Sequence, residues 1–467
     1  MPRRWRNMRI HADDTVEVRA DGQKYALREI KKGENVIKYG FPIGHATRDI
    51  ATGEQVGPQN LKSNLSGLGD WQYKPYKKPR NGMKKGSFLG FLRADGRVGI
   101  RNEIWIIPTV GCAAGVARLL AERAGEGVRA LSHPYGCSQL GGDLLRTQQV
   151  LCGLCHHPNA GGVLLLGLGC ENNGLDKMKE MLGTYDEKRV RFLNLQDCED
   201  EMAEGLSILA ELRAALADDR RTPQPISKLA IGVKCGGSDG YSGITANPLV
   251  GLVADQFFEY GTRVLMTEIP EVFGAEELLL SRAVSAEVFE DAAAVIRDFR
   301  QYFISHGEGI ADNPSPGNIA GGISTLEEKS LGCVQKGGKV PLCGALRYGD
   351  TVPEAGGLYL VDGPGNDQVA ITNLTAAGAQ LILFTTGRGT PLCAPVPTLK
   401  ISTNTPLAEK KRHWVDFDAG VLLEGIDSAE LSGSLLDLCL ATAEGKMSKG
   451  ELGGYTDIAI FKDGVTL

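Results

Sequence analysis

Apolar, strand-like runs alternate with helix-like segments through most of the chain after Phe88. In the middle region the strand-like runs lie at 104–110, 128–132, 163–168 and 190–195, and a helix-like segment follows each. This order predicts parallel strands joined by crossover helices. The alternation resumes with strand-like runs at 229–233, 264–267, 358–361, 380–384 and 398–401. We therefore predict an α/β protein with two parallel-sheet units in succession.

The segment before Phe88 has a different texture. Short strand candidates separated by Gly-containing turns fill residues 8–65, which predicts a small β module. Gly, Pro, Lys, Tyr and Asn dominate from Leu65 to Gly86, as in a linker, and a polar segment with two prolines at 218–227 marks a candidate boundary. We predict a β module at 1–66, a linker at 67–88, a middle domain at 89–224 and a C-terminal domain at 225–467.

Length, charge and cysteine content narrow the class of function. The chain has 467 residues and a formal net charge of -6, so it carries no basic field and nucleic acid is not an expected partner. No apolar run has the length of a membrane span or a secretory segment, which predicts no membrane partner and a cytoplasmic location. Eleven cysteines then indicate reduced thiols, metal ligands or catalytic groups rather than disulfides.

Five cysteines stand in short glycine-bearing segments: Cys112, Cys137, Cys170, Cys235 and Cys333. Two of these segments follow strand-like runs, so their thiols are expected at the carboxyl edge of a sheet, where open α/β folds bind ligands. Thiolates mixed with imidazole and carboxylate favour iron or zinc over magnesium or calcium, and iron or an iron–sulfur centre fits best. The alternative is that small buried cysteines fill tight glycine turns.

Other motifs offer polar groups that suit a carboxylate or hydroxyl ligand. Asn318 lies in a Gly/Pro-rich turn ahead of a helix start, and Arg388 follows a buried-looking strand. A guanidinium binds a carboxylate through two parallel hydrogen bonds, which favours Arg388 as a substrate ligand. The guanidinium groups of Arg97 and Arg101 either bind carboxylate and hydroxyl groups or brace the linker. The remaining polar candidates are Lys400, Glu268 and Glu271.

Several familiar motifs are misleading or missing. Cys152-Gly-Leu-Cys155-His156 matches the C-x-x-C-H pattern of covalent haem attachment. No export signal accompanies it and the stretch ends a helix-like segment, so we interpret its cysteines as packing residues. The sequence has no Walker A pattern, no G-x-G-x-x-G after a strand and no G-x-S-x-G elbow. Nucleotide use is therefore not expected.

Long stretches of the chain resemble one family, the altronate and galactarate dehydratases of sugar-acid catabolism. The most specific stretches lie at 96–103, 108–112, 135–140, 167–173, 235–248 and 313–333. The resemblance implies an N-terminal β-clip module of the SAF type, a linker, a middle α/β domain and a C-terminal Rossmann-like domain. It also implies iron dependence, a homodimer and loss of water from a sugar acid; altronate would give 2-dehydro-3-deoxygluconate. One departure is Gln23, where the family has a histidine.

Loss of water from a 2,3-dihydroxy carboxylate needs a base, an acid and a Lewis acid that stabilises the charge that develops. Our hypothesis assigns iron to some of the five cysteines, with His133 or Glu171 as base or extra ligand and Asp239 as a second candidate base. The candidate substrate ligands are Arg101, Asn102, Asn318, Arg388 and Lys400. The iron is either a single Fe2+ ion or an iron–sulfur cluster.

Two alternatives stay open at this point. One is a dehydratase or lyase of another polar acid, such as galactarate or sulfolactate. The other is a non-enzymatic protein that binds a sugar acid, which leaves the array of cysteines unexplained.

Overall fold

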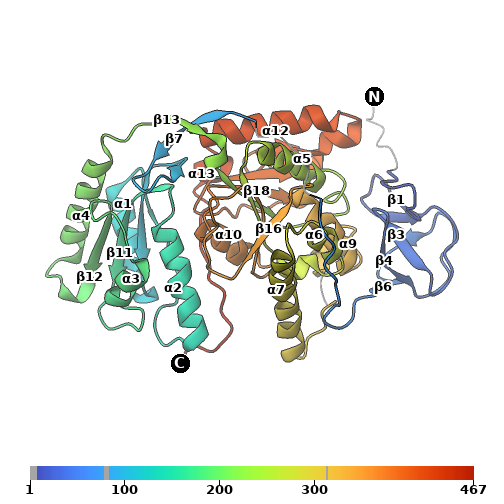
Figure 1. Ribbon diagram of the computed structural model, residues 1–467, viewed down its shortest axis with the longest axis horizontal. Coiled ribbons are helices and arrows are strands. Elements are labelled where there is room, and N and C mark those ends of the chain that lie inside the picture. Colours follow the sequence, from blue (N-terminus) through green and yellow to red (C-terminus); the bar gives the residue numbers. More distant parts are fainter. Residues whose placement is uncertain (1–7, 78–83, 312–313) are drawn as a thin grey trace.

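The computed structural model describes residues 8–77, 84–311 and 314–467. Three parts follow one another along its long axis (Figure 1). A small β module lies at one end, the middle α/β domain lies at the other, and the larger C-terminal domain lies between them. The sequence order of the parts is therefore not their order in space.

The N-terminal module consists of two three-stranded antiparallel sheets. One contains β1 (Val16–Val18), β2 (Lys24–Ala26) and β5 (Gln55–Val56), and the other contains β3 (Asn35–Lys38), β4 (Phe41–Ala46) and β6 (Leu61–Lys62). Alternate side chains of such short strands face one side, and here they form a small core with Ile30, Ile43 and Ile50. The small β module expected from the sequence is confirmed.

The linker packs against α7 (Ala286–Ser305) of the C-terminal domain. The Arg300 guanidinium lies 5.3 Å from the Trp71 ring centroid and donates to Gly67 O at 3.0 Å. Tyr73 meets Phe289 edge to face. Part of the predicted linker, residues 78–83, lies outside the described residues.

A third small sheet joins the two ends of the middle domain. It contains β7 (Ser87–Leu92), β8 (Val98–Gly99) and β13 (Thr222–Pro225), and β13 pairs only with β7 among the described strands. The segment 218–227, interpreted from sequence as a domain boundary, thus also supplies an edge strand. An edge strand tolerates prolines because the N–H groups on its open side have no ladder to join.

The middle domain is built on a four-stranded parallel sheet in the order β10-β9-β11-β12. Its strands are β9 (Glu103–Pro108), β10 (Val128–Ala130), β11 (Ala160–Gly167) and β12 (Val190–Asn194). Its helices are η1 (Gly111–Ala113), α1 (Ala114–Ala124), α2 (Gly141–Cys155), α3 (Leu175–Leu182), η2 (Leu195–Asp197) and α4 (Glu201–Leu216). Ile104 and Ile106 face α1 and α4, while Trp105 and Ile107 face the opposite side.

The C-terminal domain is built on a seven-stranded, all-parallel sheet in the order β16-β17-β15-β14-β18-β19-β20. Its strands are β14 (Ala230–Cys235), β15 (Arg263–Met266), β16 (Leu342–Leu346), β17 (Gly357–Val361), β18 (Leu381–Thr386), β19 (Thr398–Ser402) and β20 (Phe417–Asp418). The five strands predicted here are confirmed. The sequence analysis did not identify β16 and β20, because Gly344 interrupts the mostly half-buried β16 and β20 has only two residues.

Helices cover both faces of this sheet. They are η3 (Ile226–Lys228), α5 (Ala246–Glu259), η4 (Ile269–Val272), α6 (Glu276–Leu280), α7, α8 (Pro316–Ala320), α9 (Leu326–Cys333), η5 (Val334–Gly337), α10 (Asp367–Ala376), α11 (Thr405–Lys410), η6 (Gly420–Glu424), α12 (Ser428–Ala443) and α13 (Lys449–Gly453). Leu265 and Ile382 of this sheet share one hydrophobic core with Trp105 and Leu165 of the middle domain. This shared core fixes the two α/β sheets relative to each other.

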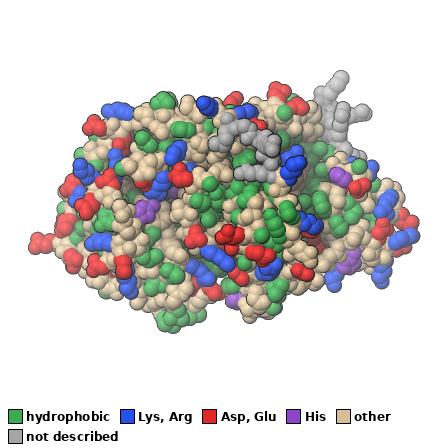
Figure 2. Space-filling model, viewed as in Figure 1, with side chains coloured by type: hydrophobic (Ala, Val, Ile, Leu, Met, Phe, Trp, Pro, Cys, Tyr) green, Lys and Arg blue, Asp and Glu red, His purple; other side chains and the backbone are tan. Residues whose placement is uncertain are grey.

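The surface carries both signs of charge. On the face shown in Figure 2, Lys and Arg side chains are interspersed with Asp and Glu, and no continuous basic area is visible there. Within the described ranges, no helix combines the length and the apolar character needed to cross a membrane.

Candidate active site

The central strand of the C-terminal sheet ends at Cys235. β14 pairs with β15 on one side and with β18 on the other, so the chain extends the sheet from β14 in both directions. Where the order of strands reverses in this way, the loops diverge and leave a crevice at the carboxyl edge. Cys235 therefore lies where open α/β sheets bind ligands.

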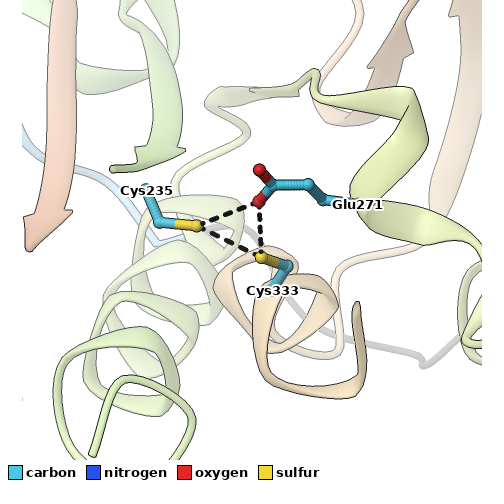
Figure 3. Close-up of side chains that lie close together, drawn as sticks. All are labelled: Cys235, Glu271 and Cys333. Carbon is cyan, nitrogen blue, oxygen red and sulfur yellow. Dashed lines mark hydrogen bonds between the residues drawn. The ribbon is translucent and has the colours of Figure 1, made fainter. Parts of the chain in front are cut away.

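Three side chains from different elements form a triad there (Figure 3). The Sγ atoms of Cys235 and Cys333 are 3.1 Å apart, and Glu271 Oε2 accepts from Cys333 at 3.0 Å and from Cys235 at 3.4 Å. β14 supplies Cys235, η4 supplies Glu271 and α9 ends at Cys333. In the described part of the chain, this is the only group of three or more Cys, His, Asp or Glu side chains whose ligand atoms all lie within 4.8 Å.

Glu271 connects the thiols to a buried ammonium group. Its Oε1 lies 2.7 Å from Lys329 Nζ, and the two side chains are 4% and 8% exposed. Burial alone raises the pKa of Glu271, but three lysines, above all Lys329, outweigh burial and lower it. Burial alone lowers the pKa of Lys329, and Glu271 raises it above its ordinary value. The pair is therefore charged at neutral pH.

A second set of ion pairs lies next to the triad. Glu268 accepts from Lys234 and lies 2.8 Å from Lys336 Nζ, and Lys234 Nζ also lies 2.8 Å from Asp367 Oδ1. Burial and the charge of Glu271 raise the pKa of Glu268. Glu268 has a left-handed backbone (φ 71°). This conformation is strained for any residue other than glycine, so the surrounding structure must hold it in place.

The charges of this region leave room for a divalent cation. Three lysines balance three carboxylates while both thiols are protonated, and the hydrogen bond to Cys235 together with burial raises the pKa of Cys333. A divalent cation would let both thiols lose their protons without a net charge in the buried site. Two sulfur donors and one carboxylate oxygen suit iron or zinc. The residues present therefore fit the expected iron.

A cavity of about 540 Å³ opens beside the triad. Its lining includes Cys235, Ser238, Glu271, Ser315, Asn318, Lys329, Asp367 and Arg388. The volume is that of a small-molecule site, and the lining offers two cations together with hydroxyl and amide groups. The cavity therefore suits a small, polar, anionic ligand.

The N-terminal module is anchored to the helix that carries Cys333. Glu328 of α9 forms ion pairs with Lys24 and Lys38 at 2.8 and 2.7 Å, and all three side chains are 1% exposed. Burial raises the pKa of Glu328, but the two lysines lower it to about 2 overall. Thr325 Oγ1 also donates to Ile43 O at 2.5 Å. α9 thus joins the module to the triad.

Comparisons with known protein families cover all three parts of the chain. Residues 5–64 match the altronate/galactarate dehydratase SAF domain, residues 90–217 the D-galactarate dehydratase/altronate hydrolase second domain, and residues 226–466 the D-galactarate/altronate dehydratase C-terminal domain. The chain belongs to the altronate/galactarate dehydratase family. This confirms the resemblance seen in the sequence and the α/β fold with an N-terminal SAF module.

Curated relatives are similar over nearly their full length. The altronate dehydratase of Bacillus subtilis (strain 168) is 47% identical over 474 residues, which cover 98% of this chain and 95% of the relative. That of Escherichia coli (strain K12) is 46% identical over 469 residues, with 97% and 94% covered. The galactarate dehydratase (L-threo-forming) of the same strain is 31% identical over 484 residues, with 96% and 91% covered. These relatives support the expected hydro-lyase class.

Two of the predicted substrate ligands of this dehydratase-family chain line the cavity. Asn318 Nδ2 donates to Ser238 O at 3.0 Å, and its Oδ1 accepts from Ser315 Oγ at 2.7 Å, so its amide is held in place. Arg388 is exposed, and its guanidinium has no hydrogen bond or ion pair with any described residue. Its full binding capacity is therefore open to a ligand.

Two other candidates have structural partners instead. Asp239 is buried beside the cavity, and its carboxylate accepts from Thr403 Oγ1 at 2.8 Å, Asn404 Nδ2 at 3.0 Å and Ser242 Oγ at 3.0 Å. Burial raises its pKa in spite of these bonds. Lys400 lies 3.9 Å from the Phe384 ring centroid, donates to a backbone carbonyl and does not line the cavity.

Arg101 and Asn102 hold the start of the middle domain in place through the hydrogen bonds below, which do not involve the linker predicted at 67–88. Arg101 binds Glu451 through Nε at 2.7 Å and Nη2 at 3.0 Å, and its Nη1 donates to Thr442 O at 2.9 Å. Asn102 Oδ1 accepts from Arg93 Nη1 at 2.7 Å. Neither side chain lines the cavity.

The structure divides the five predicted metal ligands between two sheets. Cys235 and Cys333 meet in the triad, whereas the other three lie in the middle domain, Cys112 in η1 and Cys137 and Cys170 in loops. One centre that uses all five is therefore not formed, and the hypothesis that some of the five hold iron stays a prediction.

The candidate bases His133 and Glu171 lie in the same middle-domain loops. His133 Nε2 bonds to Pro108 O at 2.8 Å and Nδ1 accepts from Tyr135 N at 3.2 Å, so both ring nitrogens are engaged. Burial lowers the pKa of His133 to about 4, which keeps the ring neutral. Glu171 accepts from Thr109 Oγ1 at 2.7 Å and from two backbone amides of its own turn.

The sequence did not single out the lysines around the triad. Lys234 interrupts the otherwise apolar β14, and a charged residue inside a buried strand is a signal of a buried ion pair. Lys329 and Lys336 lie in and after the short helix α9, where no periodic pattern marks them as buried. Their burial depends on the packing of η4 against α9, which no local pattern in the sequence reveals.

Proposed function

We propose that this protein is an altronate dehydratase that removes water from D-altronate to give 2-dehydro-3-deoxy-D-gluconate. The observation that carries the proposal is the meeting of two thiols and a carboxylate beside a cavity of about 540 Å³ in a chain of this family. Similarity supports the choice of substrate, because relatives named altronate dehydratase are 47% and 46% identical, whereas the galactarate dehydratase is 31% identical.

Iron is the proposed cofactor of this site, with Cys235, Cys333 and Glu271 as its ligands. The close approach of their donor atoms and the charge balance described above support this assignment. When bound, iron would supply Lewis acidity that stabilises negative charge on the substrate oxygens.

The residues that line the cavity divide the remaining tasks. Arg388 would bind the substrate carboxylate through two parallel hydrogen bonds, and Asn318 would orient a hydroxyl group. Asp367, with 33% of its side chain exposed, is the proposed base for the proton on C2. Lys329 is the proposed acid that protonates the hydroxyl leaving C3. Loss of both groups gives an enol, which becomes the 2-keto acid.

The proposal includes a homodimer, which the family resemblance supports, and a cytoplasmic location, which the sequence predicts because it has no apolar run of secretory length. Light scattering on the purified protein tests the dimer. A mass of 50.0 kDa, that of one chain, would contradict it.

A panel of acids tests the substrate. Iron-loaded protein prepared without oxygen is incubated with D-altronate, galactarate or sulfolactate, and the 2-keto product is measured. We expect D-altronate to react fastest. Faster reaction of galactarate would change the substrate, and no product from any acid would contradict dehydration.

Two variants test the site itself. Cys235→Ser should lower turnover of D-altronate by about 100-fold or more, because it removes a metal ligand. Arg388→Ala should raise KM by about tenfold or more, because the carboxylate loses its charged partner. Cys152→Ser is the matched control. Cys152 lies in α2, outside the triad, and its variant should keep full activity. Normal activity of Cys235→Ser would remove the triad from the reaction.

A further inference from the structure

Three Gly-Cys pairs of the middle domain have no part in the proposed reaction. They are Gly111-Cys112 after β9, Gly136-Cys137 after β10 and Gly169-Cys170 after β11. β9 lies between β10 and β11 and pairs in parallel with both, so the carboxyl ends of all three strands meet at one edge of the sheet. The same edge therefore receives three thiols.

Strand register brings the two loops that carry Cys112 and Cys170 to neighbouring positions at the edge of the sheet. Pro108 pairs with Leu166, and Cys112 and Cys170 each follow their paired residue by four positions. Because neighbouring strands lie about 4.8 Å apart, equal offsets bring the loops after β9 and β11 alongside each other. The loop with Cys137 follows the strand on the other side of β9.

Glycines allow the backbones of these loops to touch. Gly136 has φ 102°, and a Cβ atom there would lie 2.0 Å from Thr109 O. A Cβ atom at Gly111 would lie 2.8 Å from Pro134 O. Any side chain at either position would push the loops after β9 and β10 apart, so glycine is needed for their contact.

The residues after Cys170 tie the three loops together. Glu171 accepts from Thr109 Oγ1 at 2.7 Å, Asn172 Oδ1 accepts from Ser138 N at 2.8 Å, and Asn173 Nδ2 donates to Thr109 O at 2.9 Å. Each of these hydrogen bonds joins the loop after β11 to the loop after β9 or the loop after β10. The three cysteines are thus held on one interlocked platform.

Three local features indicate that this platform is built for a ligand. Asn173 is fully buried, yet its Oδ1 has no hydrogen-bond partner among the described residues. Ser138, directly after Cys137, has a left-handed backbone (φ 55°), which costs free energy that an ordinary surface turn would avoid. Gln196 Nε2 also donates to Cys170 Sγ at 3.6 Å.

We propose that Cys112, Cys137 and Cys170 ligate an iron–sulfur cluster at this edge. Cys112 and Cys170 are exposed and Cys137 is half-buried, so iron and sulfide can reach them. The three Sγ atoms do not all lie within 4.8 Å of one another. Thiolates about 2.3 Å from a single ion are at most about 4.6 Å apart, whereas a cluster distributes its cysteines over several iron atoms. On assembly each thiol loses its proton and binds one iron. The proposal does not rest on the reaction proposed above.

Reconstitution of the full chain tests the cluster. Protein prepared without oxygen is incubated with ferric iron, inorganic sulfide and a thiol that reduces part of the iron, then desalted, and its iron, acid-labile sulfide and visible spectrum are measured. The unaltered chain should retain sulfide and show sulfide-to-iron charge-transfer absorption. Cys112→Ser and Cys170→Ser should each lose most of both signals, and the triple serine variant should lose all. Circular dichroism checks the fold, which substitution of exposed thiols should not change.

Two control variants separate this site from the triad. Cys152→Ser, at a half-buried cysteine of the same domain, should keep the sulfide of the unaltered chain. Cys235→Ser should also keep it while it loses dehydratase activity. The proposal is overturned if the unaltered chain retains no sulfide, if the triple variant retains as much as the unaltered chain, or if these cysteines bind metal without sulfide.

Discussion

The thiols of the C-terminal domain and those of the middle domain have a similar local position but opposite environments. In each, a cysteine in a glycine-bearing turn stands at the carboxyl end of a parallel strand. In the C-terminal domain, Cys235 and Cys333 are 2% and 4% exposed and lie among buried ion pairs. In the middle domain, Cys112 and Cys170 are exposed, and amide hydrogen bonds hold their loops. The comparison teaches that the parallel strand places the thiol at the edge of the sheet, while the neighbouring charges determine the chemistry of the thiol.

The two carboxylates next to the thiols give the largest expected difference. Glu271→Gln should lower the free energy of unfolding by about 3–5 kcal/mol, because the buried Lys329 ammonium loses the carboxylate of its ion pair. Glu171→Gln should cost only about 1 kcal/mol, because it weakens hydrogen bonds in a partly exposed turn. Urea unfolding of the metal-free proteins measures both.

A second substitution controls for the loss of charge. Glu271→Gln combined with Lys329→Met removes both members of the pair and should recover part of the lost stability. Equal losses for Glu271→Gln and Glu171→Gln would show that both regions depend on buried charge, which would remove the contrast between them.

Acid should affect the two regions in different pH windows. Burial lowers the pKa of His133 from 6.5 to about 4. Between these pH values the unfolded chain binds more protons than the folded chain. The stability that the neutral ring contributes is therefore lost as pH falls from 6.5 to 4. Against burial, Lys24 and Lys38 lower the pKa of Glu328 from 4.5 to about 2, so its contribution is lost as pH falls from 4.5 to 2. Each contribution is at most about 3 kcal/mol.

Urea unfolding between pH 7 and pH 3 separates these contributions. His133→Gln should flatten the upper window in part, since His157, with a pKa lowered by burial to about 3, still titrates there. Glu328→Gln should flatten the lower window. An unchanged slope between pH 6.5 and 4 in His133→Gln would show that this ring is not neutral in the folded protein.

The order of strands and helices along the chain was predictable, because the apolar runs and helical patterns that indicate them lie within each segment. Buried parallel strands form apolar runs in the sequence, and the helix-like segment expected after the run at 163–168 is present as α3 (Leu175–Leu182). β13 was harder to predict, because prolines at 223 and 225 argue against a strand unless it lies at a sheet edge. Whether it does depends on its pairing with β7, about 130 residues earlier in the chain.

The candidate site was predictable only in part. Cys235 and Cys333 were recognisable as thiols in glycine-bearing segments, but nothing local shows that they meet while Cys112 does not join them. The strand order decides that, because it carries β14 and β9 into different sheets. Arg101 illustrates the opposite error: its motif is distinctive, yet Glu451 near the other end of the chain occupies its guanidinium.

The smallest expected effect concerns thiol reactivity in the metal-free protein. Cys112 and Cys170 are exposed and should react with iodoacetamide as ordinary surface thiols do. Cys333 should react at least about tenfold more slowly, because it is buried and because its hydrogen bond to Cys235 together with burial raises its pKa, so little thiolate forms. Timed alkylation followed by mass spectrometry gives each rate, with buried Cys439 as the internal standard. If Cys333 reacted as fast as Cys112, the triad would have to open to solvent readily, and burial could no longer explain how the two regions differ.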